Sequence, residues 1–177
     1  QNFFQMESID YKKVAKEVFE VQNKVRQDPK CLVENLKNTL QYFKGNTIWR
    51  PNNPVGLSTN EGPNAYKECI AFLEKAKPLP PLKWDDKIAL AAQDHCDDTG
   101  PKGVTGHTGT NGSSVGDRCK KRGANEYCGE NCSYGYATAE EIVMQLLVDD
   151  GVPSRGHREN IFRDTYKSCG VGVGPHK

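Results

Sequence analysis

The sequence predicts a single α+β domain in which helices pack on a sheet. The length of 177 residues suits one domain better than two. Apolar residues recur at helical spacing over much of the chain, and residues 169–174 alternate Gly and Val. That alternation predicts a strand pressed closely against other backbone. We therefore expect residues 1–177 to form one domain, with residues 1–10 as an N-terminal tail.

Helices are expected where apolar positions are spaced by three or four residues. The first begins near Asp10 with Val14, Val18, Val21 and Val25 on one face; Asp28-Pro29 breaks it, and a second helix continues to about Phe43. Further helices are predicted over 64–75, 85–97 and 138–148. Thr138 and Glu141 have the spacing of a capping box at the start of the last one.

The segments between these helices are predicted to be irregular. Residues 44–62 are dense in Asn, Pro and Gly and predict a surface loop. Residues 100–116 contain many glycines and predict a tightly folded backbone. The basic run at 118–122 is interpreted as a solvated helix face.

Composition excludes several classes of partner. Lys plus Arg is 24 and Asp plus Glu is 23, so a net charge of +1 provides no field for a nucleic acid or an anionic membrane. The apolar stretches fall far short of the roughly 20 residues that span a bilayer. We expect no nucleic-acid partner and no membrane span.

Seven cysteines indicate an oxidising compartment. The chain has no Cys-x-x-Cys pair, so disulfides are favoured over zinc ribbons. Their pairing stays open, and an odd count leaves one thiol over. The start has no leader sequence, which suggests a mature secreted chain. The stop just after the Gly-Val run suggests a fragment whose missing tail holds a partner cysteine.

Two histidines are candidates for a metal site because small residues flank each of them. These are His107 and His157, with Glu130 and Asp149 as acidic partners elsewhere in the chain. Two imidazoles and one or two carboxylates suit a Zn²⁺ site with an open position. The alternative is that both histidines make only local hydrogen bonds. His95 is interpreted as a satisfied core residue.

A serine-based site is the other candidate. Gly112–Gly116 matches the Gly-x-Ser-x-Gly pattern with Ser114 as nucleophile, and Asp149 and His157 follow in hydrolase order. That elbow requires an apolar strand before the serine, whereas residues 105–111 are polar and glycine-rich. The segment is therefore interpreted as a turn.

Four ordered motifs stand out along the chain: Gly106–Ser114, Gly129–Asn131, Leu147–Arg158 and Val171–Gly174. Together they resemble the CAP superfamily, which groups cysteine-rich secretory, antigen 5 and pathogenesis-related 1 proteins, also called SCP-like extracellular proteins. Glu61 and the Pro78–Leu82 link are similar to the bacterial and protist branch. The resemblance extends from about Tyr11 to His176, and it implies a final strand after the Gly-Val run that this sequence lacks.

The resemblance implies an α-β-α sandwich with a central, mainly antiparallel sheet, stabilised by disulfides, in a secreted protein. It also implies a cavity formed by His107, Glu130, Asp149 and His157 that in some members binds Zn²⁺ or another divalent cation. The second acid is usually Glu, so Asp149 is one methylene shorter than expected.

Three functions are compatible with this resemblance. The first is a non-enzymatic binding module that holds a metal or polar ligand in the cavity. The second is a hydrolase with Glu130 or Ser114 as the catalytic residue. The third is a lipid or sterol carrier, or a partner of a surface protein, that uses apolar surface near Tyr134 to Tyr136 and the 44–62 loop. Fold similarity alone does not choose among them.

Overall fold

The computed structural model describes residues 9–51 and 53–177. The helices are α1 (Tyr11–Gln27), α2 (Val33–Leu40), α3 (Pro63–Lys75), α4 (Asp86–Thr99), α5 (Val115–Lys121), α6 (Ala139–Val148) and α7 (Gly156–Ile161), with a 3-10 turn at Gly100–Lys102. The strands are β1 (Phe43–Lys44), β2 (Thr47–Ile48), β3 (Leu57–Ser58), β4 (Lys83–Trp84) and β5 (Ser168–Cys169). This content agrees with the predicted α+β class.

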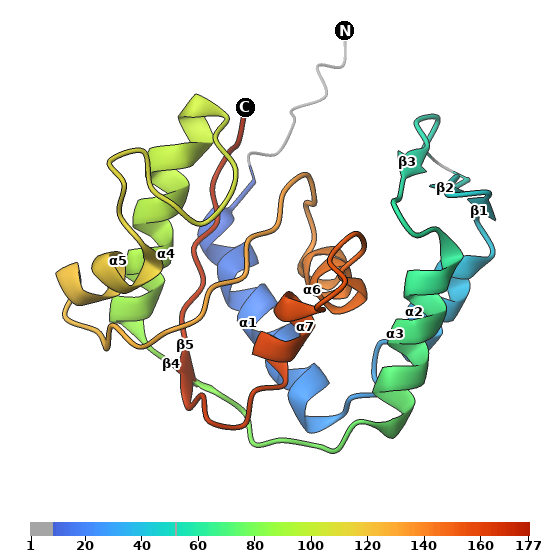
Figure 1. The fold of residues 1–177 in the computed structure, drawn as a ribbon, viewed down its shortest axis with the longest axis horizontal. Coiled ribbons are helices and arrows are strands. Elements are labelled where there is room, and N and C mark those ends of the chain that lie inside the picture. Colours follow the sequence, from blue (N-terminus) through green and yellow to red (C-terminus); the bar gives the residue numbers. More distant parts are fainter. Residues whose placement is uncertain (1–8, 52) are drawn as a thin grey trace, which may run out of the picture.

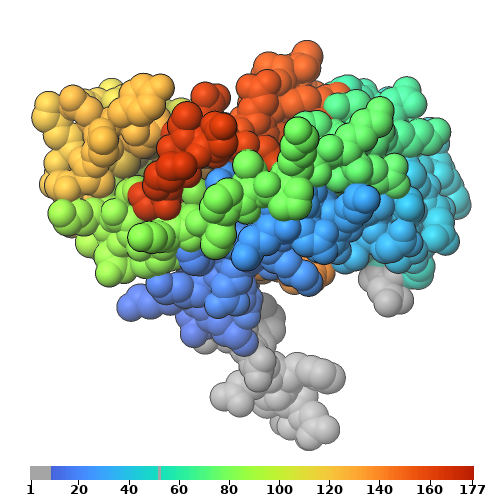
Figure 2. All heavy atoms as spheres, turned by 90° about the horizontal axis from the view of Figure 1, so that it is seen from below, coloured from blue at the N-terminus to red at the C-terminus, as the bar shows by residue number. Residues whose placement is uncertain are grey.

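The helices form layers on either side of extended chain. Figure 1 shows α4 and α5 on one side, α1, α6 and α7 in the centre, and α2 and α3 with β1–β3 on the other side. The β4–β5 pair and the C-terminal segment run between α4 and the central helices. Seen from below, the molecule is elongated, with the region of α5 at one end and the region of α2 and β1–β3 at the other (Figure 2).

The main hydrophobic core lies among α1, α2, α3, α6 and α7. Val25, Leu36, Leu73 and Leu147 are each fully buried in it. Val18 is also buried, and Val14 and Val21 pack against the cluster, as the valine spacing of α1 predicts. The core therefore fixes α6 and α7 against α1.

The helix starts follow from capping side chains. The carboxylate of Asp10 accepts a hydrogen bond from Lys13 N, and that of Asp85 accepts from Lys87 N and Ile88 N. The Thr138 hydroxyl accepts from Glu141 N, so the predicted cap of α6 is confirmed. These short polar side chains satisfy N–H groups that a first helical turn leaves free.

The central antiparallel sheet expected from the resemblance is not found in residues 9–51 and 53–177. The antiparallel sheet, β1-β2-β3, lies at one end of the molecule, inside the segment predicted to be an irregular loop. The central pair, β4 with β5, is parallel and two residues long. The physical reason lies in the Gly-Val run after β5, which packs on the backbone of α4 instead of pairing with further strands.

Two glycines of the C-terminal segment allow that close packing. A Cβ at Gly170 would lie 2.1 Å from Ala89 N, and one at Gly172 would lie 2.5 Å from Gln93 N. Both distances are too short for a side chain, so only glycine fits. The prediction that the Gly-Val run is pressed against other backbone is confirmed.

The predicted disulfides are not confirmed. All seven cysteines lie in the described part of the chain and are free thiols: Cys31, Cys69, Cys96, Cys119, Cys128, Cys132 and Cys169. Burial is the main cause that raises the pKa of the Cys128 thiol to about 12. A hydrogen bond with the Cys119 thiol is the second cause. Disulfide stabilisation stays a prediction for the oxidised protein.

Among the described helices, none has the length and apolar character that crossing a membrane requires.

Gly172→Ala is expected to lower the free energy of unfolding by at least about 2 kcal/mol, because the new methyl group would force the C-terminal segment away from α4. Gly174→Ala is the matched control, since a Cβ there would meet Cys96 Cβ at an ordinary 3.5 Å. Urea unfolding of both variants measures the difference. Equal stability of the two variants would contradict the proposed packing.

Candidate functional site

The first half of the candidate site is a hydrogen-bonded chain from Arg118 to His107. Arg118, on α5, is only 5% exposed, and its Nη2 donates to Glu130 Oε2 over 2.6 Å. The other carboxylate oxygen, Oε1, lies 3.0 Å from Nδ1 of His107. Arg118 Nη1 also donates to the carbonyls of His107 and Ser113, both at 3.1 Å. Arg118 therefore positions Glu130 and the histidine loop together.

This role corrects the interpretation of residues 118–122 as a solvated face. Arg118 and Cys119 are buried, whereas Lys120 and Lys121 are exposed. Only part of the basic run faces water, because the ion pair with Glu130 compensates the burial of Arg118.

Tyr134 and a glycine hold the histidine loop from the other side. Gly106 N donates to the Tyr134 hydroxyl over 3.0 Å. Gly106 has φ of 104°, a conformation that residues with a side chain rarely adopt. The residue before His107 therefore has to be glycine for this turn to form.

The second half of the candidate site is built around Asp149. Asp149 is 1% exposed and ends α6 in a left-handed conformation, with φ of 56°. Its Oδ2 accepts from the backbone N–H of His157 over 2.8 Å, and its Oδ1 lies 2.6 Å from His157 Nδ1. A single carboxylate thus caps the first turn of α7 and orients the imidazole.

Arg155 stabilises the connection between α6 and α7. It has φ of 53°, which is uncommon for a residue with a long side chain. Its guanidinium donates to the Asp149 carbonyl at 2.8 Å and to both carboxylate oxygens of Glu61, at 2.6 and 2.7 Å. These bonds offset the backbone strain beside His157.

Asparagine side chains join the two halves. Asn131 Nδ2 donates to the His157 carbonyl over 3.0 Å, and Asn160 Nδ2 donates to Asn131 Oδ1 over 2.9 Å. As a result, the His107 and His157 rings face each other with their centres 6.4 Å apart and their planes tilted by 32°. Within the described residues, no hydrogen bond involves Nε2 of either ring.

The model of the family described as "CAP: Cysteine-rich secretory protein family" matches residues 19–177. The chain belongs to the CAP family. That match covers nearly the whole chain, and the resemblance given by the sequence motifs is confirmed.

One curated relative comes from a bacterium. The chain is 29% identical over 114 residues to the Bacillus subtilis (strain 168) protein titled "Uncharacterized protein YkwD". The aligned region is 62% of this chain and 42% of the relative, so this CAP chain spans less than half of that protein's length. No solved structure gives a significant match.

The structure brings together all four residues that the sequence predicts for the CAP cavity: His107, Glu130, Asp149 and His157. It also separates their tasks. Each acid contacts Nδ1 of one histidine, an arrangement in which the acid orients a metal-binding imidazole whose Nε2 stays free. The shorter Asp149 reaches its histidine, because the left-handed turn places it directly at the start of α7.

Ser114 lies elsewhere, at the start of α5. Its hydroxyl accepts from Asp117 N over 3.2 Å, and Asp117 Oδ2 accepts from Ser114 N over 2.9 Å, which completes a capping box. The described residues offer it no hydrogen bond to a histidine. The geometry agrees with the interpretation of residues 112–116 as a turn, and it gives Ser114 a structural task.

A small hollow lies in the region suggested for a lipid. A cavity of about 90 Å³ beside Tyr136 is lined by Leu57, Tyr66 and Asp150 among others. Pockets for small molecules usually have volumes of about 300–1,000 Å³. A larger hollow of about 400 Å³ lies between α2 and α6, and its lining includes the charged side chains of Arg50, Glu140 and Glu141. Lipid binding stays a prediction.

Sequence reasoning missed the positioning role of Arg118 and the placement of Cys132. Cys132 Sγ lies 3.5 Å from His107 Nδ1 and 3.7 Å from Glu130 Oε1. Burial and the nearby Glu130 carboxylate raise the pKa of the Cys132 thiol to about 12. The Gly129–Asn131 motif predicted that this segment contributes to the site. No pattern of sequence spacing predicts that Cys132 lies beside His107.

Glu61→Gln is expected to destabilise the protein by about 1 kcal/mol at pH 7 and by much less near pH 2. Hydrogen bonds from Arg155, and then from Gly151 N–H, lower the pKa of Glu61 to about 2. Because the pKa of Glu61 is lower in the folded protein than in the unfolded chain, where it is near 4.3, the ion pair stabilises the fold above about pH 4.3. This stabilisation is lost as the pH falls toward 2. Urea unfolding of wild type and variant between pH 7 and pH 2 measures this.

Glu20→Gln serves as the control for that titration. Glu20 is exposed on α1 and makes no ion pair with the described residues. Its replacement should change stability little at any pH. A Glu61→Gln effect that does not depend on pH would contradict the assigned ion pair with Arg155.

Proposed function

We propose that this CAP chain is a secreted binding module that holds one divalent metal ion, preferentially Zn²⁺, between His107 and His157. The observation that carries the proposal is the pairing of each imidazole with a carboxylate at Nδ1, at 3.0 Å for His107 and 2.6 Å for His157. Because each Nδ1 is occupied, the ligand atom of each ring is Nε2.

The ring positions support this fit. With Zn–N bonds of about 2.0–2.1 Å, two imidazoles on a tetrahedral zinc ion have their centres about 5 Å apart. The observed 6.4 Å separation therefore closes with a movement of little more than about 1 Å. The side chain of His107 is half-exposed, so its loop has room to make that movement.

The two acids supply orientation in this proposal. Glu130 and Asp149 hold the Nδ1–H tautomer of each ring and fix the orientation of its Nε2. Arg118 and the α7 backbone in turn fix the two carboxylates. Two histidines leave further metal positions for a water molecule or for a polar ligand carried by a binding partner.

A binding role is favoured over hydrolysis because the candidate catalytic groups have other partners. Glu130 has one oxygen on Arg118 and the other on His107, and the Ser114 hydroxyl caps α5. A bound zinc ion would supply Lewis acidity, but neither acid is placed as an unpaired base.

Equilibrium dialysis with Zn²⁺ at neutral pH tests the proposal. His107→Ala and His157→Ala should each lose one bound ion per chain, or bind it at least about tenfold more weakly, because each removes a ligand. His176→Ala is the matched control, since His176 is exposed and its Nε2 lies 3.1 Å from the Val104 carbonyl. Equal zinc binding by wild type and all three variants would overturn the proposal.

A further inference from the structure

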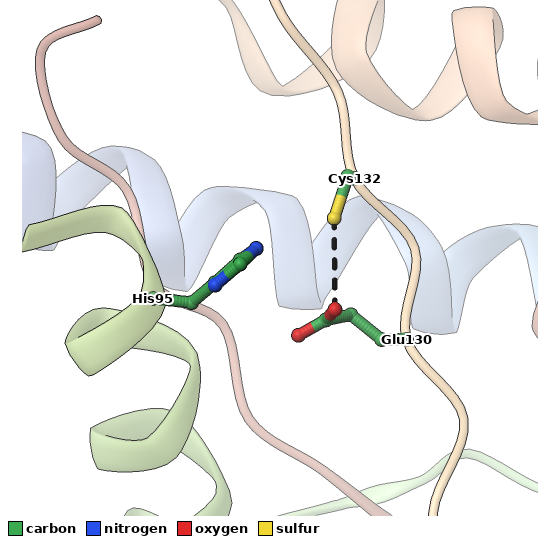
Figure 3. A group of neighbouring side chains, drawn as sticks. All are labelled: His95, Glu130 and Cys132. Atoms are coloured by element: carbon green, nitrogen blue, oxygen red, sulfur yellow. Dashed lines mark hydrogen bonds between the residues drawn. The ribbon is translucent and has the colours of Figure 1, made fainter. Parts of the chain in front are cut away.

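A second group of metal-ligating side chains lies next to the two histidines. One ligand atom each from His95, Glu130 and Cys132 lie within 4.8 Å of one another. Figure 3 shows the His95 ring extending from α4 toward Glu130 and Cys132, which stand on one neighbouring extended segment. Neither His95 nor Cys132 is among the four residues that the family resemblance implies for the CAP cavity.

The burial of His95 leaves one of its nitrogens without a partner. The residue is 6% exposed, and its Nε2 lies 2.8 Å from the Gly106 carbonyl oxygen. Its Nδ1 is buried and has no hydrogen-bond partner in the described structure. Buried polar atoms nearly always have a partner, so an unpaired imidazole nitrogen beside a thiol and a carboxylate needs an explanation. The expectation that His95 is a satisfied core residue is therefore wrong in this respect.

Glu130 and Cys132 are already arranged as neighbouring ligands. Arg118 holds Oε2 of Glu130 at 2.6 Å, which leaves Oε1 facing Cys132 Sγ at 3.7 Å. In a tetrahedral zinc site, ligand atoms are about 3.3–3.6 Å apart, given bond lengths of about 2.0–2.3 Å. The thiol and the carboxylate are therefore close to the required spacing before any ion is bound.

We propose that His95, Glu130 and Cys132 form a second zinc site, separate from the one between His107 and His157. Imidazole, carboxylate and thiolate are all ligands that Zn²⁺ accepts, and either imidazole nitrogen can serve. A sulfur ligand disfavours Mg²⁺ and Ca²⁺, which take oxygen. The thiolate and the carboxylate carry two negative charges between them, which matches a divalent ion.

The two sites meet at Glu130. Its Oε1 has two lone pairs, so it can bind the inner ion and still accept the His107 Nδ1–H bond at 3.0 Å. The inner site goes beyond the proposed function, since it uses neither His107 nor His157 as a ligand. Each proposal therefore stands or fails alone.

Cobalt spectroscopy tests the inner site directly, because Co²⁺ replaces Zn²⁺ and a cobalt–thiolate bond has an intense near-ultraviolet charge-transfer band. The reduced full chain is titrated with Co²⁺, and Zn²⁺ is added afterwards. Wild type should develop the band and lose it on zinc addition. Cys132→Ser should abolish the band, whereas the control Cys128→Ser should retain it, because Cys128 lies outside the cluster. Absence of the band in wild type, or its persistence in Cys132→Ser, would overturn the proposal.

Two further measurements make the test independent of any single variant. The double variant His107→Ala/His157→Ala should lose the ion between the two histidines but keep the cobalt–thiolate band. Loss of the band in this variant would mean that there is one shared site, and it would overturn the proposed inner site. In unmodified protein, Zn²⁺ should slow alkylation of Cys132 at least tenfold while Cys128 reacts as before, as read by mass spectrometry. Equal labelling of Cys132 with and without Zn²⁺ would also overturn the proposal.

Discussion

The buried pairing of Asp149 with His157 is the interaction on which the candidate site depends. A carboxylate that is 1% exposed is costly unless its oxygens find donors. Asp149 finds them in the backbone N–H and the Nδ1 of His157, at 2.8 and 2.6 Å. Because the two residues are eight positions apart, this pairing requires the chain to turn sharply between α6 and α7. The left-handed conformations of Asp149 and Arg155, and the ion pair of Arg155 with Glu61, make that turn.

The other half of the site repeats the same chemistry with different anchors. Glu130 is held by a buried arginine, and its free oxygen orients His107. Asn131 then ties this half to the α7 backbone. Two segments that lie far apart in the sequence thus present their imidazoles to each other. The consequence is a pair of facing rings whose Nδ1 atoms contact carboxylates and whose Nε2 atoms are the ligand atoms of the proposed metal site.

The helices could be predicted from the sequence because their causes are local. Valine spacing gives α1 its buried face, and Thr138 starts α6 by capping Glu141 N. The sheet could not be predicted in the same way, because its strands are two residues long and their pairing depends on distant segments. The Gly-Val run shows the difference. Its close backbone contact follows from Gly170 and Gly172, but the helix partner, α4, is set by the tertiary fold.

That the four candidate residues lie close together was predictable from the sequence, but the contacts between them were not. Motifs named His107, Glu130, Asp149 and His157, whereas no sequence pattern states which ring nitrogen an acid contacts. In the proposed metal site, the ring nitrogen that an acid contacts decides whether the acid is a metal ligand or only orients the histidine. Cys132 and His95 were not recognisable as partners, because 37 positions separate them and only the packing of α4 brings them together.

The most direct test of the paired-carboxylate arrangement is the tautomeric state of the two imidazoles, measured by ¹⁵N NMR of the metal-free protein at a pH where both rings are neutral. Glu130 and Asp149 should hold His107 and His157 in the Nδ1–H tautomer, with an unprotonated Nε2 that shifts on addition of Zn²⁺. A predominant Nε2–H tautomer in either ring would contradict the arrangement, because the nitrogen offered to the metal would then carry the proton.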